Sequence, residues 1–269
     1  MELHTGMTRG IPAVVIGSGN VASCVVPALQ KAGVIDTVAV YSPTPGHAEA
    51  LAARLGEARG VCRIEDIPTE GVKLYLLAVK DDAVAELART LKPVPEAVWL
   101  HTSGGVEAST LAPLTEHFGV FYPLQTFSKG VEVDLSKVPV FVEGADEFAL
   151  TTARALGNAI SPKVYDADGT TRCRLHSAAV FACNFTNHLW AVADDILRRE
   201  TGTDLTVLAP LLEETMRKAL TMRPADGQTG PARRGDTGVM AKHISLLTDD
   251  EARLYDILSK SIMKYYELD

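Results

Sequence analysis

The sequence predicts an α/β protein, with a doubly wound, mostly parallel sheet followed by an all-helical C-terminal region. Three observations predict this class. A short apolar run at residues 13–16 ends in a glycine-rich turn, and a helical pattern follows it. Strand-like and helix-like segments then alternate, which is typical of parallel strands covered by helices. After about residue 165 the pattern is helical throughout. We expect two domains, residues 1–162 and residues 163–269.

The turn after the first strand carries the pattern Gly-x-Gly-x-x-Ala, from Gly17 to Ala22. Gly17 can adopt the backbone angles of a tight turn, and Gly19 has no Cβ, so a pyrophosphate can approach the main chain. The free N–H groups of Asn20 and Val21 at the helix start would face the phosphates. An ordinary strand–helix turn is the alternative. The position directly after a Val/Ile strand favours a Rossmann dinucleotide-binding domain.

The other elements of the first domain are predicted from hydrophobic periodicity. The expected strands are 37–41, 74–79, 97–101, 120–122, 138–142 and a short one at 163–165. The expected helices are 21–32, 47–55 and 81–91. The run 74–79 contains no polar residue, as expected for a strand that is covered on both faces.

The second domain is predicted to be helical, with roles in substrate binding and dimerisation. The expected helices are 170–200, one that begins at Asp204, 239–247 and 249–266, with a Gly-, Pro- and Arg-rich loop at 224–238. The first helix is long and apolar, and a small domain does not easily bury all its faces. We therefore expect a homodimer formed through this domain.

The composition limits the partners and the compartment. A formal net charge of −8 argues against a nucleic-acid surface, and the four cysteines lie far apart without a Cys-x-x-Cys pair. We expect no metal site, and reduced thiols in the cytoplasm. Residues 1–10 lack the apolar core of a signal peptide. Polar side chains interrupt the apolar stretch 175–193, which predicts a buried helix and not a membrane span.

The end of the second strand indicates which nucleotide is bound. NAD-binding units place an acidic residue there to hold the ribose hydroxyls, but residues 41–44 read Tyr-Ser-Pro-Thr. No carboxylate would repel a 2′-phosphate, and Ser42 and Thr44 offer hydroxyl donors. This favours NADP, with NAD as the alternative. Simple turn chemistry explains Ser42 and Thr44 equally well, and His47 and Arg54 lie in the following helix.

Ligands of doubly wound sheets bind beyond the carboxyl ends of the strands, and two segments fall there. Val79 and Lys80 follow the unbroken apolar strand, where Lys80 could lie near the nicotinamide ribose or the phosphates. His101 and Ser103 belong to a small, hydroxylated loop suited to substrate and cofactor. Gln125 lies in a proline-stiffened segment that could form one wall of the pocket. Plain turns and helix caps are the alternative in each case.

The long helix carries a stripe of polar side chains. At about 100° per residue, Asn184 and Asn187 lie near the face of His176. Buried amides and imidazoles need partners, so this stripe is expected to face a cleft, a ligand or another chain. Histidine titrates near neutral pH, which makes His176 the candidate general acid. Asn184 could orient a carbonyl or imine group, and Asn187 could contact the substrate. A structural histidine is the alternative.

The loop at 229–236 combines Gly, Pro and two arginines. Arg234 could hold a substrate carboxylate in a bidentate fork, which would suit an anionic substrate. A solvent-exposed loop between two helices is the alternative, although its length and composition favour a function.

Several segments together resemble one family. They are the glycine turn 17–22, the loop 101–104, the segment 121–128, the helix segments 175–181 and 184–188, and the loop 229–234. Over nearly its full length the chain resembles a family that joins an N-terminal Rossmann-like NADP-binding domain to a C-terminal helical domain of unknown function. Its members are commonly labelled deazaflavin-dependent NADP oxidoreductases. The family is similar in fold to pyrroline-carboxylate reductases and to hydroxyacid and 6-phosphogluconate dehydrogenases.

Two positions depart from the pattern that this resemblance implies. The family often has Ser-Arg-Thr after the second strand, and Pro43 takes the place of the arginine, which weakens the expectation of tight 2′-phosphate binding. The related hydroxyacid dehydrogenases have a catalytic lysine four residues before an asparagine of their long helix. Val180 stands at that place here, so we do not expect their lysine mechanism.

The sequence thus predicts an NAD(P)-dependent oxidoreductase, with NADP preferred. It would transfer hydride to or from a small carbonyl or imine substrate, with a carboxylate on that substrate as one option. The alternative is a non-catalytic NADPH-binding redox sensor or regulatory module. The missing lysine favours the alternative, and the polar stripe with His176 favours the enzyme.

Overall fold

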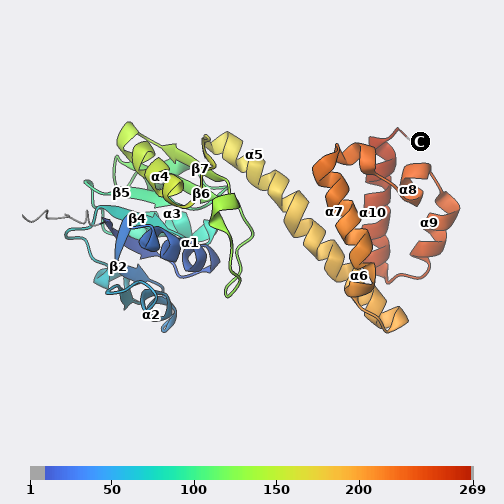
Figure 1. The fold of residues 1–269 in the computed structure, drawn as a ribbon, viewed down its shortest axis with the longest axis horizontal. Coiled ribbons are helices and arrows are strands. Elements are labelled where there is room, and N and C mark those ends of the chain that lie inside the picture. Colours follow the sequence, from blue (N-terminus) through green and yellow to red (C-terminus); the bar gives the residue numbers. More distant parts are fainter. Residues whose placement is uncertain (1–9, 268–269) are drawn as a thin grey trace, which may run out of the picture. The chain divides into compact units, whose positions relative to one another are not determined.

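A computed structural model describes residues 10–267, and the chain divides into two compact units, residues 1–180 and 181–269. The first unit contains one eight-stranded sheet with the strand order β3-β2-β1-β4-β5-β6-β7-β8. Figure 1 shows the fold, with several of these strands and helices labelled. The strands are β1 (Ile11–Ile16), β2 (Ile35–Tyr41), β3 (Arg59–Val61), β4 (Leu74–Leu77), β5 (Val98–His101), β6 (Phe118–Pro123), β7 (Val140–Gly144) and β8 (Val164–Asp166). All neighbours are parallel except β6 and β7. The doubly wound, mostly parallel sheet is confirmed.

Four helices of this unit cover the two faces of the sheet: α1 (Asn20–Lys31), α2 (His47–Ala52), α3 (Asp81–Thr90) and α4 (Glu147–Ile160). A fifth helix, α5 (Gly169–Ala179), follows β8 and contributes no residue to these two cores. Alternate residues of β1 enter different cores: Ala13 and Val15 join the cluster with α1, α2 and α4, whereas Val14 and Ile16 join the cluster with α3. Successive side chains of a strand point to opposite faces, so this central strand is apolar throughout.

The sequence did not predict β3 or α4, and it placed the end of α2 three residues too late. The start of α4 has a local signal: the carboxylate of Asp146 caps it by accepting from the Ala149 N–H at 2.8 Å. β8 lies beyond the expected domain boundary at residue 162 and pairs with β7. The first compact unit therefore includes β8 and α5 and extends to Val180.

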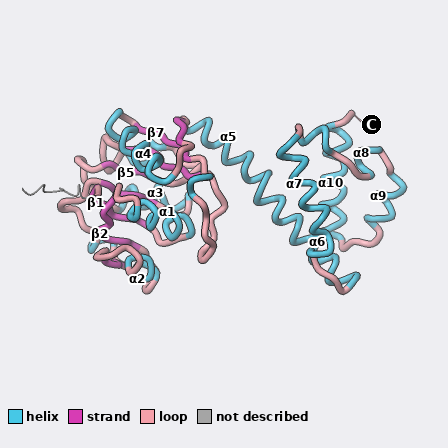
Figure 2. Tube along the Cα trace, in the orientation of Figure 1, coloured by secondary structure: helices cyan, strands magenta, loops and turns pink. Residues whose placement is uncertain are grey.

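The second unit is helical in its described part (Figure 2). Its elements are α6 (Thr186–Thr201), η5 (Leu205–Leu208), α7 (Ala209–Thr221), η6 (Pro224–Gly227), α8 (Pro231–Arg234), α9 (Thr237–Ile244) and α10 (Asp249–Tyr265). The segment 224–238, expected to be a loop, thus contains η6, α8 and the start of α9. In the described part of the chain, no helix is both long enough and apolar enough to cross a membrane.

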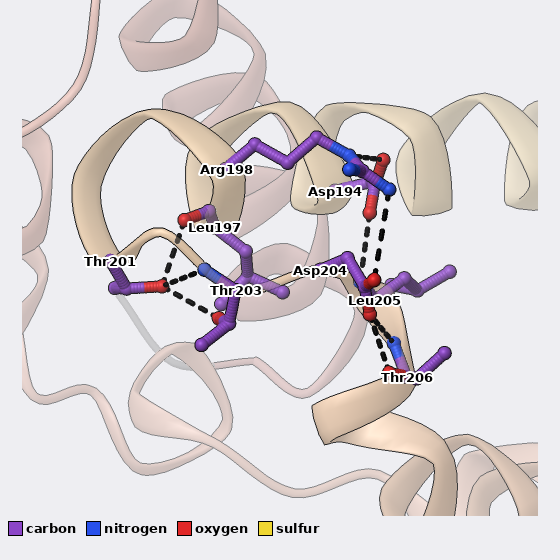
Figure 3. Close-up of polar contacts among 8 residues, drawn as sticks. All are labelled: Asp194, Leu197, Arg198, Thr201, Thr203, Asp204, Leu205 and Thr206. Atoms are coloured by element: carbon purple, nitrogen blue, oxygen red, sulfur yellow. Dashed lines mark hydrogen bonds and ion pairs between the residues drawn. The ribbon is translucent and has the colours of Figure 1, made fainter.

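The turn between α6 and η5 is held by side-chain hydrogen bonds (Figure 3). Asp194 accepts from the Nε of Arg198 and from the Leu205 N–H, both at 2.7 Å. Asp204 caps η5 by accepting from the Thr206 N–H at 3.0 Å. Gly202 ends α6 in the left-handed region with a φ of 70°, where glycine avoids strain. The helix start predicted at Asp204 is therefore a 3₁₀ turn that leads into α7.

The long helix expected at 170–200 is helical throughout, but it is not regular. Residues Val180–Phe185 form a π-helical segment between α5 and α6. The stretch 175–193, expected to be buried, contains only exposed and half-buried side chains. Phe181 and Phe185 are 70% and 51% exposed and contact each other edge to face. Within the single chain this stretch is therefore not covered as a buried helix would be, because apolar sequence alone does not show what covers a helix.

Glu251 at the start of α10 links acidity to the stability of the second unit. Its carboxylate accepts from both Nη atoms of Arg199 on α6 at 2.9 Å and closes a capping box with Thr248. The hydrogen bonds from Arg199 lower the pKa of Glu251 from 4.5 to about 2. The stabilisation is therefore complete above pH 4.5 and lost as the pH falls towards 2.

We predict that Glu251→Gln lowers the free energy of unfolding, and that its difference from the wild type shrinks as the pH falls from 5 to 2. Denaturant unfolding at a series of pH values measures this difference. Glu213→Gln on α7 is the control, because Glu213 forms no ion pair within residues 10–267. A difference that is constant with pH would contradict this role of the carboxylate.

Candidate functional site

A hollow of about 750 Å³ opens at the carboxyl ends of β1, β2 and β4. The strand order reverses between β1 and β4, and ligands of doubly wound sheets bind at such a point. Residues expected from the sequence to bind a dinucleotide line it: Gly17, Gly19, Asn20, Val21, Ser42, Thr44, Val79 and Lys80. The structure thus brings together segments that follow three different strands.

The glycine turn has the geometry that phosphate binding requires. Gly17 has a φ of 109°, and a Cβ there would lie 2.4 Å from the carbonyl oxygen of Ala78. Gly19 caps α1 without any side-chain hydrogen bond, and the nearest atom to a Cβ there would be 3.9 Å away. Gly17 is therefore required by the fold, whereas Gly19 leaves the N–H groups of the helix start open to a ligand.

The end of β2 bears no carboxylate, as the sequence indicated. Ser42 is buried and its N–H donates to the Val61 carbonyl at 3.1 Å, whereas Thr44 is exposed. Lys80 is exposed and stands at the N-cap of α3. Glu86 of α3 is the acidic residue among those that line this hollow.

A pair of polar side chains lies beside the loop that follows β5. The Oη of Tyr122, on β6, lies 2.9 Å from the Nδ1 of His176, on α5. A Cβ on Gly104 would lie 2.8 Å from both rings, so only glycine lets the loop pass so close to them. Burial and the negative charge of Asp81 raise the pKa of Tyr122 to about 12, so the phenol stays protonated.

The hydrogen bond to Tyr122 uses Nδ1 of His176, and Nε2 takes no part in it. A neutral imidazole accepts on Nδ1 from the hydroxyl, and an imidazolium donates from Nδ1 to the phenol oxygen. In either state Nε2 is not used in this bond, and the ring is held in one orientation. Tyr122 begins the segment 122–128 that was predicted, with Gln125, to form a wall of the pocket, but it was given no chemical role of its own.

The loop after β5 is supported from beneath by His101 and Arg172. Arg172 is 1% exposed, pairs with Glu143, and donates from Nη2 to the Val106 carbonyl at 2.5 Å. His101 is fully buried, and its Nδ1 accepts from the Ser103 N–H at 3.2 Å. Burial and the charge of Arg172 lower the pKa of His101 to about 4, so this ring is neutral at pH 7.

Several predicted site residues take other positions. His101 lies beneath the loop, because its strand is covered on both faces, and in this structure no side-chain atom of it is open to a substrate. Ser103 lies outside the lining of the hollow, and its Oγ accepts from the N–H groups of Gly105 and Val106 at 3.1 Å. Gln125 is exposed and accepts from the Thr126 N–H at 2.7 Å.

Asn184, Asn187 and Arg234 belong to the second unit, and all three are exposed. Asn184 lies in the π-helical segment, whose wider turn departs from the α-helical spacing that predicted a common stripe with His176. Arg234 ends α8, and its neighbour Arg233 lies over the ring of Tyr266 at 4.2 Å. Arg233, and not Arg234, thus makes the cation–π contact.

Comparison with known proteins places the chain in a family. Residues 138–262 match a domain of unknown function, DUF2520. The crystal structure of the putative NADP oxidoreductase BF3122 from Bacteroides fragilis is similar over 95% of this chain and 98% of that one, with 39% identity and a TM-score of 0.88. This chain belongs to the same family, and its DUF2520 match begins just before β7 of the Rossmann-like unit and extends through most of the helical unit. The resemblance inferred from the sequence is confirmed.

More distant structures share the fold. Protein TM1727 from Thermotoga maritima is 21% identical, with a TM-score of 0.68 over 95% of this chain and 98% of that one. An imine reductase from Myxococcus stipitatus, solved with NADP⁺, is 14% identical, with a TM-score of 0.66 over 95% of this chain and 94% of that one. The chain has no match among curated proteins.

The two glycines of the turn provide a test of the site. We predict that Gly17→Ala destabilises the fold by about 1–3 kcal/mol or more, because alanine is strained at this φ and its Cβ meets the Ala78 carbonyl. Gly19→Ala should fold normally and lose dinucleotide affinity, because its Cβ occupies the approach to the main chain. Thermal unfolding and nucleotide titration separate the two effects. Undiminished nucleotide binding by Gly19→Ala would place the phosphates elsewhere.

Proposed function

We propose that this protein is an NADP-dependent oxidoreductase that transfers hydride between the nicotinamide and a small carbonyl or imine substrate. The proposal rests on two features of the same unit, a hollow with an open glycine turn at the strand ends and an oriented Tyr122–His176 pair. Asp81, next to Lys80 of the hollow, also adjoins the loop of that pair: its Oδ2 lies 3.4 Å from where a Cβ on Gly105 would be. The relative that is 39% identical is itself named for NADP.

The residues of the hollow fit a dinucleotide. The N–H groups at the start of α1 would hold the diphosphate, and Gly19 leaves the space for it. Ser42 and Thr44 would face the adenosine ribose, where an NAD-specific site has a carboxylate. Bound NADPH would supply the hydride for the reaction. The protein has to orient the substrate and deliver the proton.

His176 is the group that would deliver this proton. In its imidazolium form, Nδ1–H donates to the oxygen of Tyr122, and Nε2–H is available to the oxygen or nitrogen of the substrate. When the substrate takes the proton from Nε2, the ring is left neutral with Nδ1 still protonated and still bonded to Tyr122. The high pKa of the phenol keeps Tyr122 neutral, so it orients the ring without competing for the proton.

A non-catalytic NADPH-binding sensor is the second candidate. Val180 favours it, since the catalytic lysine that the resemblance to hydroxyacid dehydrogenases would lead one to expect is missing. We include in the proposed enzyme the exposed Asn184, Asn187 and Arg234 as substrate contacts, with Arg234 for a substrate carboxylate.

The test is NADPH oxidation with a panel of small keto acids and imines. We predict that His176→Gln lowers kcat by about 10²–10⁴-fold, the usual contribution of a general acid, with NADPH affinity retained. Tyr122→Phe should lower kcat less, because it loosens the ring but keeps it. His243→Gln is the matched control, since His243 forms a similar pair with Tyr255 Oη at 3.0 Å in the second unit.

Full activity of His176→Gln would exclude the proton role. NADPH binding without oxidation across the whole panel would favour the sensor over the enzyme.

We also propose that the helical unit forms a homodimer. Its helices expose large apolar side chains, among them Leu211, Met216 and Leu220 on α7 and Ile257 on α10. Such surfaces in a helical unit are typical of subunit contacts.

We predict that sedimentation equilibrium at micromolar concentration gives twice the mass of the chain, and that Leu220→Glu shifts it towards the monomer. Phe148→Glu, at an exposed position of α4 in the first unit, is the control. A wild-type monomer would exclude the dimer.

A further inference from the structure

A second hollow, of about 620 Å³, lies between α1, α2 and the loop that precedes residue 135. It shares Ser18, His47 and Lys129 with the hollow at the strand ends. The two spaces therefore meet beside the end of β2, next to the glycine turn. Nothing in the proposed chemistry of His176 accounts for this second space.

Two cations line the second hollow, Arg54 after α2 and Lys129 on the loop. Within residues 10–267 neither has an ion-pair partner, although Arg63, Arg154 and Arg198 all do. Glu132 is the acidic residue among those that line this space. Unpaired positive charges around one hollow repel each other, and an anion bound between them removes that cost. The arrangement is notable in a chain with a net charge of −8.

The loop that carries Lys129 is attached to the first turns of α1. The Asn20 Nδ2 donates to the Phe127 carbonyl at 2.9 Å, and the Cys24 thiol donates to the Ser128 carbonyl at 3.9 Å. Burial raises the pKa of Cys24, which keeps the thiol protonated, and the charge of Arg54 opposes this shift. Arg54 is thus close enough to α1 for its charge to act on Cys24. The hydrogen bonds from Asn20 and Cys24 hold the loop with Lys129 near the N-terminus of α1, where the phosphates are proposed to bind.

The end of β2 provides no positive charge to bind a 2′-phosphate, and the two cations of the second hollow would supply it. Residues 42–44 offer two hydroxyls and a proline, whereas a 2′-phosphate on the adenosine ribose carries a double negative charge. In this fold the adenosine ribose lies at the end of β2, where the two hollows meet. A cation that binds the 2′-phosphate must therefore come from a neighbouring segment.

We propose that Lys129 and Arg54 bind the 2′-phosphate of NADP and so set the preference of this protein for NADP over NAD. This inference rests on the proposed binding of NADP in the hollow at the strand ends. It assigns to the loop 125–133 a role in nucleotide recognition. It also gives the site a source of positive charge in place of the arginine that the family often has where this chain has Pro43.

The test compares ligands with and without the 2′-phosphate. Dissociation constants are measured for NADPH, NADH, 2′,5′-ADP and 5′-ADP. Lys129→Met and Arg54→Gln should each weaken NADPH and 2′,5′-ADP by about tenfold or more, the value of a charged hydrogen bond, and change NADH and 5′-ADP by less than about twofold. Lys129→Arg should restore most of the NADPH affinity.

Lys137→Met is the matched control. Lys137 lies just beyond the same loop, is already paired with Asp134 at 3.0 Å, and does not line either hollow. It should leave all four constants unchanged. Because Lys129 and Arg54 are exposed, the variants should also keep the wild-type melting temperature without ligand.

Equal losses for NADPH and NADH would assign Lys129 to the diphosphate and overturn the inference, as would unchanged NADPH affinity in both variants. A wild-type protein that binds NADPH and NADH equally would overturn it as well. The proposed catalysis can fail without this inference. If the protein prefers NADPH but does not oxidise it with any substrate of the panel, the recognition site stands and only the enzymatic role is lost.

Discussion

The close approach of Gly17 to the end of β4 is the constraint on which the site depends. No Cβ fits between this turn and the Ala78 carbonyl, so the chain leaves β1 pressed against its neighbour and enters α1 with open N–H groups. The same approach brings Val79 and Lys80 to the turn and puts the hollow where the strand order reverses. Side chains elsewhere add charge and chemistry to a space that the backbone has already shaped.

The chemical part of the site is built differently. Tyr122 comes from β6, His176 from α5 and Gly104 from the loop after β5. The buried Arg172 holds that loop by donating a hydrogen bond to the Val106 carbonyl. These elements are far apart in the sequence, and each is held by a contact that is costly to break: a ring packed against a glycine, or a buried ion pair. The phosphate region relies on one local turn, whereas the proton donor relies on long-range packing.

Most of the sheet and the nucleotide residues could be predicted from the sequence, because both rest on local patterns. Strands that are apolar on both faces, and glycines directly after a strand, are visible in a few consecutive residues. β3 was missed because it has only three residues and its position is set by its pairing with β2. α4 was missed although its buried residues follow the helical period and Asp146 caps its start. The stripe of His176, Asn184 and Asn187 assumed a regular helix, and the π-helical segment departs from that spacing.

The amino-acid sequence was sufficient to predict the fold class, the family and the dinucleotide turn. Turn conformation and hydrophobic alternation depend on residues that are close together in the sequence. Burial and pairing required the tertiary structure. His101 and His176 look alike as isolated histidines, yet one is enclosed with a pKa near 4 and the other is half-exposed and oriented by Tyr122. Their difference arises from segments up to some seventy residues away that fold against them, and no local pattern records those contacts.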